Sequence, residues 1–150
     1  MNKLVSLLFF IIGLTSFSDV VIAQCADYGS KDCVKYLDDY HPNGQINTAS
    51  LLPGESAKVQ MIFYRGHDYR LVFCSEEHLG ELAIKVMTSK GDVLFDNSEH
   101  DMDTHWDFSM KATQRFIIEV TSTNPDEEEL MEGCVAISVG VRPSVKKGFN

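Results

Sequence analysis

From about residue 45 onward, apolar and polar residues alternate with a period of two, which is typical of strands that bury one face. The alternating segments lie at 58–63, 69–74, 82–86, 93–95, 106–110, 116–120 and 134–141, with an eighth candidate near 45–51. Turn-forming residues separate them, as in Arg65-Gly66-His67-Asp68. The pattern predicts an all-β fold, an antiparallel β-sandwich or jelly roll of about seven or eight strands.

A helical period precedes these strands. Four residues, Cys33, Tyr36, Leu37 and Tyr40, are spaced as i, i+3, i+4 and i+7, which places them on one face of an amphipathic helix. We expect Ser30 to cap this helix and the turn residues 41–44 (His-Pro-Asn-Gly) to end it. Because so short a helix cannot fold alone, it is expected to pack on the sandwich.

The first residues have the pattern of an export signal. Met1-Asn2-Lys3 is a positive start, an apolar run follows, and Val21-Ile22-Ala23 supplies small residues for cleavage after Ala23. A membrane anchor is less favoured, because Thr15, Ser16, Ser18 and Asp19 break the run. Lipidation of Cys25 is also less favoured, because Gln24 precedes it where a small residue is needed.

These patterns predict four regions. They are a signal peptide at 1–23, a cysteine-bearing helical segment at 24–44, a β-sandwich at 45–143 and a flexible tail at 144–150. We therefore expect an exported protein, in the periplasm or at the cell surface and beyond, without a membrane span after cleavage.

Four cysteines follow the predicted cleavage point, and in an exported chain an even number indicates two disulfides. No Cys-x-x-Cys pair is present, so structural zinc is not favoured. Spacing alone leaves three pairings open. We favour Cys74 with Cys134, because each lies opposite its strand's main apolar face, which leaves Cys25 with Cys33.

The charge of the chain limits its partners. Lys and Arg number 13 against 22 Asp and Glu, a formal net charge of −9. Nucleic acid is excluded as a partner, because phosphate binding needs a basic surface. The acidity is explained first by solubility, and second by a surface for cations or a basic partner.

The densest set of metal-ligating side chains lies in the acidic segment 96–107, with Glu99, Asp101, Asp103, His105 and Asp107. An EF-hand is excluded, because Trp106 and Ala112 occupy the positions of its glycine and its bidentate glutamate. We expect a polar loop and strand edge, with Trp106 facing the core. A different calcium site, and a zinc site through His100 and His105, are the alternatives.

No catalytic motif is present. The chain lacks a Gly-x-Ser-x-Gly elbow, a His-Glu-x-x-His pair and a glycine-rich phosphate loop. We therefore expect no enzyme activity and no cofactor, apart from the calcium alternative. Trp106, the single tryptophan, is interpreted as a core residue rather than a platform for sugar stacking.

The stretch 54–142 resembles the pre-peptidase C-terminal domain family of exported bacterial proteins. The matching segments are Gly66-His67-Asp68-Tyr69-Arg70-Leu71-Val72, Leu82-Ala83-Ile84-Lys85-Val86 with Lys90-Gly91-Asp92-Val93-Leu94, and Phe116-Ile117-Ile118-Glu119-Val120. The chain departs from that family in its cysteine-bearing front helix and at 113–115. Its start, Gln24-Cys25-Ala26-Asp27-Tyr28, is also similar to small uncharacterised exported proteins of Gram-negative bacteria.

The resemblance implies a jelly-roll domain that is a non-catalytic accessory. Together these observations favour an exported, disulfide-stabilised interaction domain with a protein partner. A module that binds calcium or a glycan through 96–107 is the second hypothesis, and a hydrolase of unrecognised type is the third.

Overall fold

The computed structural model describes residues 25–123 and 131–144. The predicted signal peptide and residues 145–150 of the predicted tail lie outside this range. The strands are β1 (His41–Leu51), β2 (Ser56–Phe63), β3 (His67–Ser75), β4 (Leu82–Thr88), β5 (Val93–Asp96), β6 (His105–Ser109), β7 (Gln114–Ser122) and β8 (Gly133–Pro143). Short 3-10 turns lie at η3 (Glu77–Leu79) and η4 (Asn97–Glu99).

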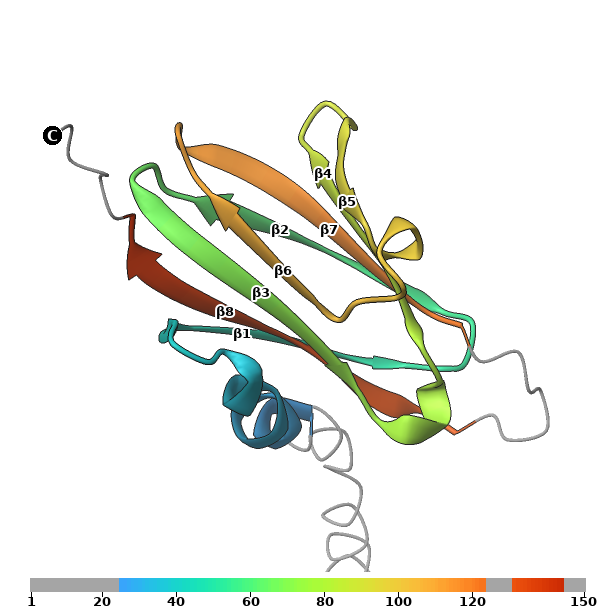
Figure 1. The fold of residues 1–150 in the computed structure, drawn as a ribbon. Helices are drawn as coiled ribbons and strands as arrows, with labels where there is room; N and C mark the ends of the chain where they lie inside the picture. Colours follow the sequence, from blue (N-terminus) through green and yellow to red (C-terminus); the bar gives the residue numbers. More distant parts are fainter. Residues whose placement is uncertain (1–24, 124–130, 145–150) are drawn as a thin grey trace, which may run out of the picture.

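The strands form two antiparallel sheets that stack face to face (Figure 1). The first sheet has the order β1-β8-β3-β6 and the second the order β2-β7-β4-β5. Consecutive strands therefore lie in different sheets for much of the chain, as in an eight-stranded jelly roll. The β-sandwich predicted from the alternation is confirmed.

Alternation explains which side chains enter the core. Along β7, Phe116, Ile118 and Val120 are buried, while the residues between them are more exposed. An aromatic group fills one end of the core, where the ring of Phe63 lies 5.0–5.2 Å from the rings of Tyr69, Phe108 and Phe116. Large apolar side chains from both sheets thus share one interior.

Strand β8 departs from simple alternation because both of its faces are covered. Val135, Ile137 and Val139 join the core between the sheets. Ala136 and Ser138 point to the other face and are buried as well. The segment that covers this outer face of the first sheet is the N-terminal helical segment, residues 25–40 (Figure 1).

The helical segment packs as predicted but has a different shape. Cys33, Leu37 and Tyr40 are buried against the sheet, in a cluster with Val72 and Ala136. The helical turns begin at residue 25 and end with η1 (Gly29–Cys33), a π-type turn, and η2 (Val34–Tyr36).

Two details of the helix prediction are wrong. The hydroxyl of Ser30 donates to the carbonyl of Asp27 and does not cap a helix that begins after it. Tyr36, expected on the buried face, is 56% exposed, because the π-type turn and the early end of the helix rotate it out of the apolar row.

The predicted turn at 41–44 is also wrong, because these residues belong to β1. The turn-forming residues instead lie at an irregularity inside β1, where the register with β8 shifts between Pro42 and Ile46. Gly44 has φ +79° there, a left-handed conformation that glycine adopts without a Cβ penalty.

Candidate binding groove

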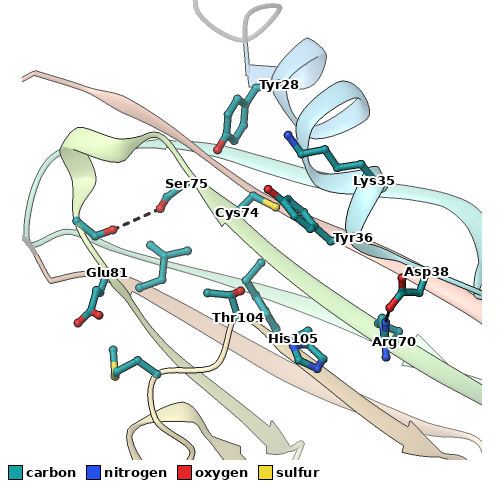
Figure 2. A pocket seen from close by; sticks show the side chains of 14 residues that line it. Tyr28, Lys35, Tyr36, Asp38, Arg70, Cys74, Ser75, Glu81, Thr104 and His105 are labelled. Carbon is teal, nitrogen blue, oxygen red and sulfur yellow. Dashed lines mark hydrogen bonds and ion pairs between the residues drawn. The ribbon is translucent and has the colours of Figure 1, made fainter.

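A groove of about 560 Å³ opens on the outer face of the first sheet, beside the helical segment (Figure 2). One wall is the helical segment, the floor is the second half of β3, and the opposite wall combines 80–82 with 102–105. Tyr28 and Tyr36 project from the helical segment toward β3, and Glu81 lies on the opposite wall (Figure 2). We call this hollow the β3 groove.

Two disulfides attach the helical segment to the sheet. Cys25 bonds to Cys134 of β8 and Cys33 bonds to Cys74 of β3, with Cα–Cα separations of 5.1 and 5.7 Å. All four cysteines are therefore paired, as expected for two disulfides. The Cys33–Cys74 bond lies at the base of the groove wall, since Cys74 is one of the lining residues.

The favoured pairing of the cysteines is wrong. Cys25 and Cys33 are eight residues apart on one helical segment, a rise of about 12 Å, which is too long for a disulfide. Cys74 lies directly opposite Ala136 rather than Cys134. Both strand cysteines do face away from the core, as the alternation predicted, but toward the cysteines of the helical segment.

Two arginines form ion pairs that connect the end of the helical segment to the first sheet. The Arg70 guanidinium holds Asp107 of β6 through two contacts of 2.7 Å and Asp38 through a third of 2.7 Å. Arg142 pairs in the same way with Asp39 and, at 3.7 Å, with Asp68. Each arginine thus links a strand carboxylate to a carboxylate of the segment, and this orients the groove wall.

The ring of Tyr40 lies beside both guanidinium groups. The distance from its centroid to the guanidinium carbon is 4.3 Å for Arg142 and 5.0 Å for Arg70. These are cation–π distances, so the ring attracts both cations in addition to the ion pairs that they form.

Two side chains that line the β3 groove have shifted pKa values. Burial raises the pKa of Tyr28 above its usual 10.0, and the nearby carboxylates of Asp32 and Glu76 raise it further. The hydrogen bond to Asp107 raises the pKa of Arg70, and the bond to Asp38 adds to it. Both groups stay protonated at neutral pH, as hydrogen-bond donors rather than as bases or nucleophiles.

The floor of the groove presents a strand edge. The N–H of Phe73 donates to the carbonyl of Thr104 at 2.8 Å, just beyond the last β3–β6 pair, Val72 with His105. By the alternation of an antiparallel ladder, the backbone groups of Ser75 point to the same side as those of Phe73. The segment before β6 pairs with β3 only as far as Phe73 and does not reach Ser75. This edge of β3 therefore faces the groove.

Asn97 organises segment 97–104, which precedes β6. Its buried side chain accepts a hydrogen bond from the N–H of Ile84 and donates one to the carbonyl of Leu82, both at 2.8 Å. It also donates to the carbonyl of Asp103 at 3.3 Å. Its backbone carbonyl accepts from His100 and Met102. Sequence reasoning missed Asn97, which lies one residue inside the acidic segment.

The predicted metal-ligating residues are dispersed around this loop. Asp107 is held by Arg70, while Asp103 lies 3.6 Å from the imidazole of His105. Glu99 and Asp101 are exposed on the loop surface, where Asp101 has φ +51°. Within 25–123 and 131–144, no group of three histidine, cysteine or carboxylate side chains is close enough to hold a metal ion. The calcium and zinc hypotheses stay predictions.

Trp106 and His100 belong to an aromatic stack at the β5–β6 side of the sandwich. The ring of Trp106 stacks on Phe108 at 4.3 Å and on Phe95 at 5.4 Å, and His100 stacks on Phe95 at 5.2 Å. Trp106 is half-buried and packs against the core, as predicted.

No helix among the described residues is long and apolar enough to cross a membrane. No protein-family model matches the chain, and neither does any curated protein. The resemblance to pre-peptidase C-terminal domains therefore stays a prediction.

Among solved structures, the chain is similar to the crystal structure of Aeromonas hydrophila PliG, a periplasmic lysozyme inhibitor of g-type lysozyme. The identity is 11%, the TM-score is 0.49, and the match covers 69% of this chain and 89% of the other. A similarity of this degree gives no basis for transferring a function.

Proposed function

We propose that this chain is an exported, non-enzymatic interaction domain that receives an extended segment of a protein partner in the β3 groove. Export to the periplasm or the cell surface is supported by the two disulfides, which persist in an oxidising compartment. The partner segment would lie along β3, between the helical segment and residues 102–105.

The observation that carries this proposal is a preformed groove with exposed aromatic side chains. Its walls are fixed by the Cys33–Cys74 disulfide and by the links from Arg70 to Asp38 and Asp107. A site that is rigid before binding loses little conformational entropy when a partner arrives. Tyr36 remains 56% exposed on one wall, and exposed tyrosines are enriched in protein interfaces.

The open edge of β3 at Ser75 adds a second mode of recognition. An extended peptide that reaches this edge can exchange main-chain hydrogen bonds with it, as in other cases of strand addition. The groove lining also supplies a hydroxyl donor, because Tyr28 stays protonated. A protonated hydroxyl favours binding over acid–base catalysis.

Site-specific photo-crosslinking tests the proposal. A photoreactive phenylalanine analogue replaces Tyr36 in one variant and Tyr64, which is 60% exposed on another surface, in the matched control. Both variants are expressed in the source organism, and crosslinked exported proteins are identified and then tested as purified pairs. We expect a partner at position 36 and none at position 64. Crosslinks at 64 alone, or at neither position, would contradict the groove as the docking surface.

A further inference from the structure

Resting on the proposed function, we infer that the segment bound in the β3 groove is basic, with lysine or arginine side chains that contact the Tyr36 ring on one wall and the Glu81 carboxylate on the other. The charges that line the groove, and the number of them that the protein itself neutralises, determine which class of partner segment fits.

The cations of the groove are paired within the protein. Arg70 contacts the carboxylates of Asp107 and Asp38, each at 2.7 Å. Lys35 lies 3.5 Å from Asp32, and both side chains are about half exposed. An acidic segment would therefore have to displace existing ion pairs to find a positive partner.

The lining residues Asp38 and Glu81 balance Lys35 and Arg70, and the carboxylates of Asp32, Glu76 and Asp107 beside the lining bring the acidic groups into excess. Glu81 lines the groove, and no described residue donates a hydrogen bond to its carboxylate or forms an ion pair with it. Asp32 and Asp38 share their cations as described above, while Glu76, which follows β3, accepts only a neutral donor, the N–H of Cys134 at 2.8 Å, among the contacts of the described residues. The fields of Asp32 and Glu76 both reach Tyr28. A cation entering the groove meets a negative field that the protein's own lysine and arginine do not cancel.

The Tyr36 ring already accepts an ammonium group. The Nζ atom of Lys35 lies 5.1 Å from the ring centroid, within the range of a cation–π contact. This contact shows that the tyrosine wall accommodates a cation next to exposed solvent. Because the Lys35 side chain is long and half exposed, a partner's lysine or arginine can share or replace its position against the ring.

The net charge of the whole chain also favours a basic partner. A formal net charge of −9 attracts a basic partner over a distance and repels an acidic one. Long-range attraction of this kind raises the association rate, whereas contacts in the groove set the lifetime of the complex. Higher salt weakens the long-range attraction. Variants that remove a charge inside or outside the groove separate this attraction from the contacts in the groove.

Fluorescence anisotropy with defined peptides tests the inference on the full disulfide-bonded chain. The probes are labelled, end-capped decapeptides of alternating glycine with lysine, with serine or with glutamate. We expect saturable binding of the lysine peptide alone, weakened by higher salt. Glu81→Gln is expected to weaken it roughly fivefold. Tyr36→Leu should weaken it by a similar factor, because the cation–π contact is lost.

Glu119→Gln is the matched control, because it removes the same charge from the outer face of the second sheet, beside Lys58. We expect it to change the affinity by less than about twofold. Equal weakening by both glutamine variants would overturn the inference, since the peptide would then respond to net charge alone. Thermal unfolding of each variant verifies that it is folded.

The peptides also separate this inference from the proposed function. Binding of the serine or glutamate peptide that Tyr36→Leu abolishes, without binding of the lysine peptide, would overturn the basic class of partner but leave the groove as a docking site. Absence of binding by the lysine peptide overturns the inference by itself, while the crosslinking at position 36 decides independently whether the groove is used.

Discussion

Gly140 of β8 lies directly beneath Tyr40, so close that a Cβ atom at position 140 would be 2.6 Å from the Cβ of Tyr40 and 3.0 Å from Leu37. We expect Gly140→Ala to destabilise the fold by about 1–3 kcal/mol, because the clash involves an atom next to the backbone and the helical segment must shift. Equilibrium denaturation measures the loss. Unchanged stability would mean that the helical segment is not held against β8.

Ser138 lies two residues away on the same face of β8 and gives the opposite prediction. It is buried, and its hydroxyl has no hydrogen-bond partner among the described residues. Ser138→Ala removes a polar group that lost its hydration on folding, so stability is expected to stay the same or rise by up to about 1 kcal/mol. A clear decrease in the denaturation midpoint would indicate an unseen partner of this hydroxyl.

The disulfide connectivity is open to direct mapping. Proteolysis under non-reducing conditions followed by mass spectrometry should yield peptides joining Cys25 to Cys134 and Cys33 to Cys74. Replacing both members of a pair by alanine is expected to cost about 4 kcal/mol for Cys33–Cys74 and about 5 kcal/mol for Cys25–Cys134, because the latter closes the longer loop. Peptides joining Cys25 to Cys33 would refute the structure here.

Asn97 is expected to be the most sensitive polar residue of the acidic segment. Asn97→Ala leaves the N–H of Ile84 and the carbonyl of Leu82 buried without their partner, at a cost of about 2–4 kcal/mol. Asn47→Ala is the control, since the partly exposed Asn47 should cost less than about 0.5 kcal/mol. Similar losses for both variants, measured by denaturation, would argue against the role assigned to Asn97.

The free energy of unfolding is expected to decrease at low pH because Asp68 becomes protonated. The hydroxyls of Ser109 and Ser144 each donate to its carboxylate at 2.6 Å, and these bonds lower its pKa below the usual 3.8. The unfolded chain therefore binds the proton first as the pH falls, so stability decreases from about pH 4 downward until the folded carboxylate is also protonated. Asp68→Asn should flatten this part of the stability–pH curve, and an identical slope in the variant would contradict the assignment.

The strands were predictable because period-two alternation follows directly from a sandwich with one interior. Phe116, Ile118 and Val120 mark the buried face of β7 in the sequence as clearly as in the structure. Leu37 and Tyr40 likewise identified the buried face of the helical segment. In both cases a row of apolar residues determines which face of the element is buried, and the spacing of such a row can be recognised in the sequence.

The cysteine pairing and the groove were not predictable in the same way, because both depend on where separate elements meet. Spacing identified the outward faces of Cys74 and Cys134 but not what covers them. The Arg70 contacts with Asp38 and Asp107 join residues that are far apart in sequence, so no local pattern reports them. Asn97 carried no signal either, because an asparagine in a polar loop is common and its buried position depends on β4.

The bond between Cys25 and Cys134 encloses nearly all of the sandwich in one covalent ring. If a protease cuts any single loop between these two residues, the fragments remain one molecule, because the sulfur link replaces the lost peptide connection. The complementary strands then stay at a high effective concentration and can keep the jelly roll assembled. A nicked chain would thus retain its groove and lose it only when cutting is followed by reduction.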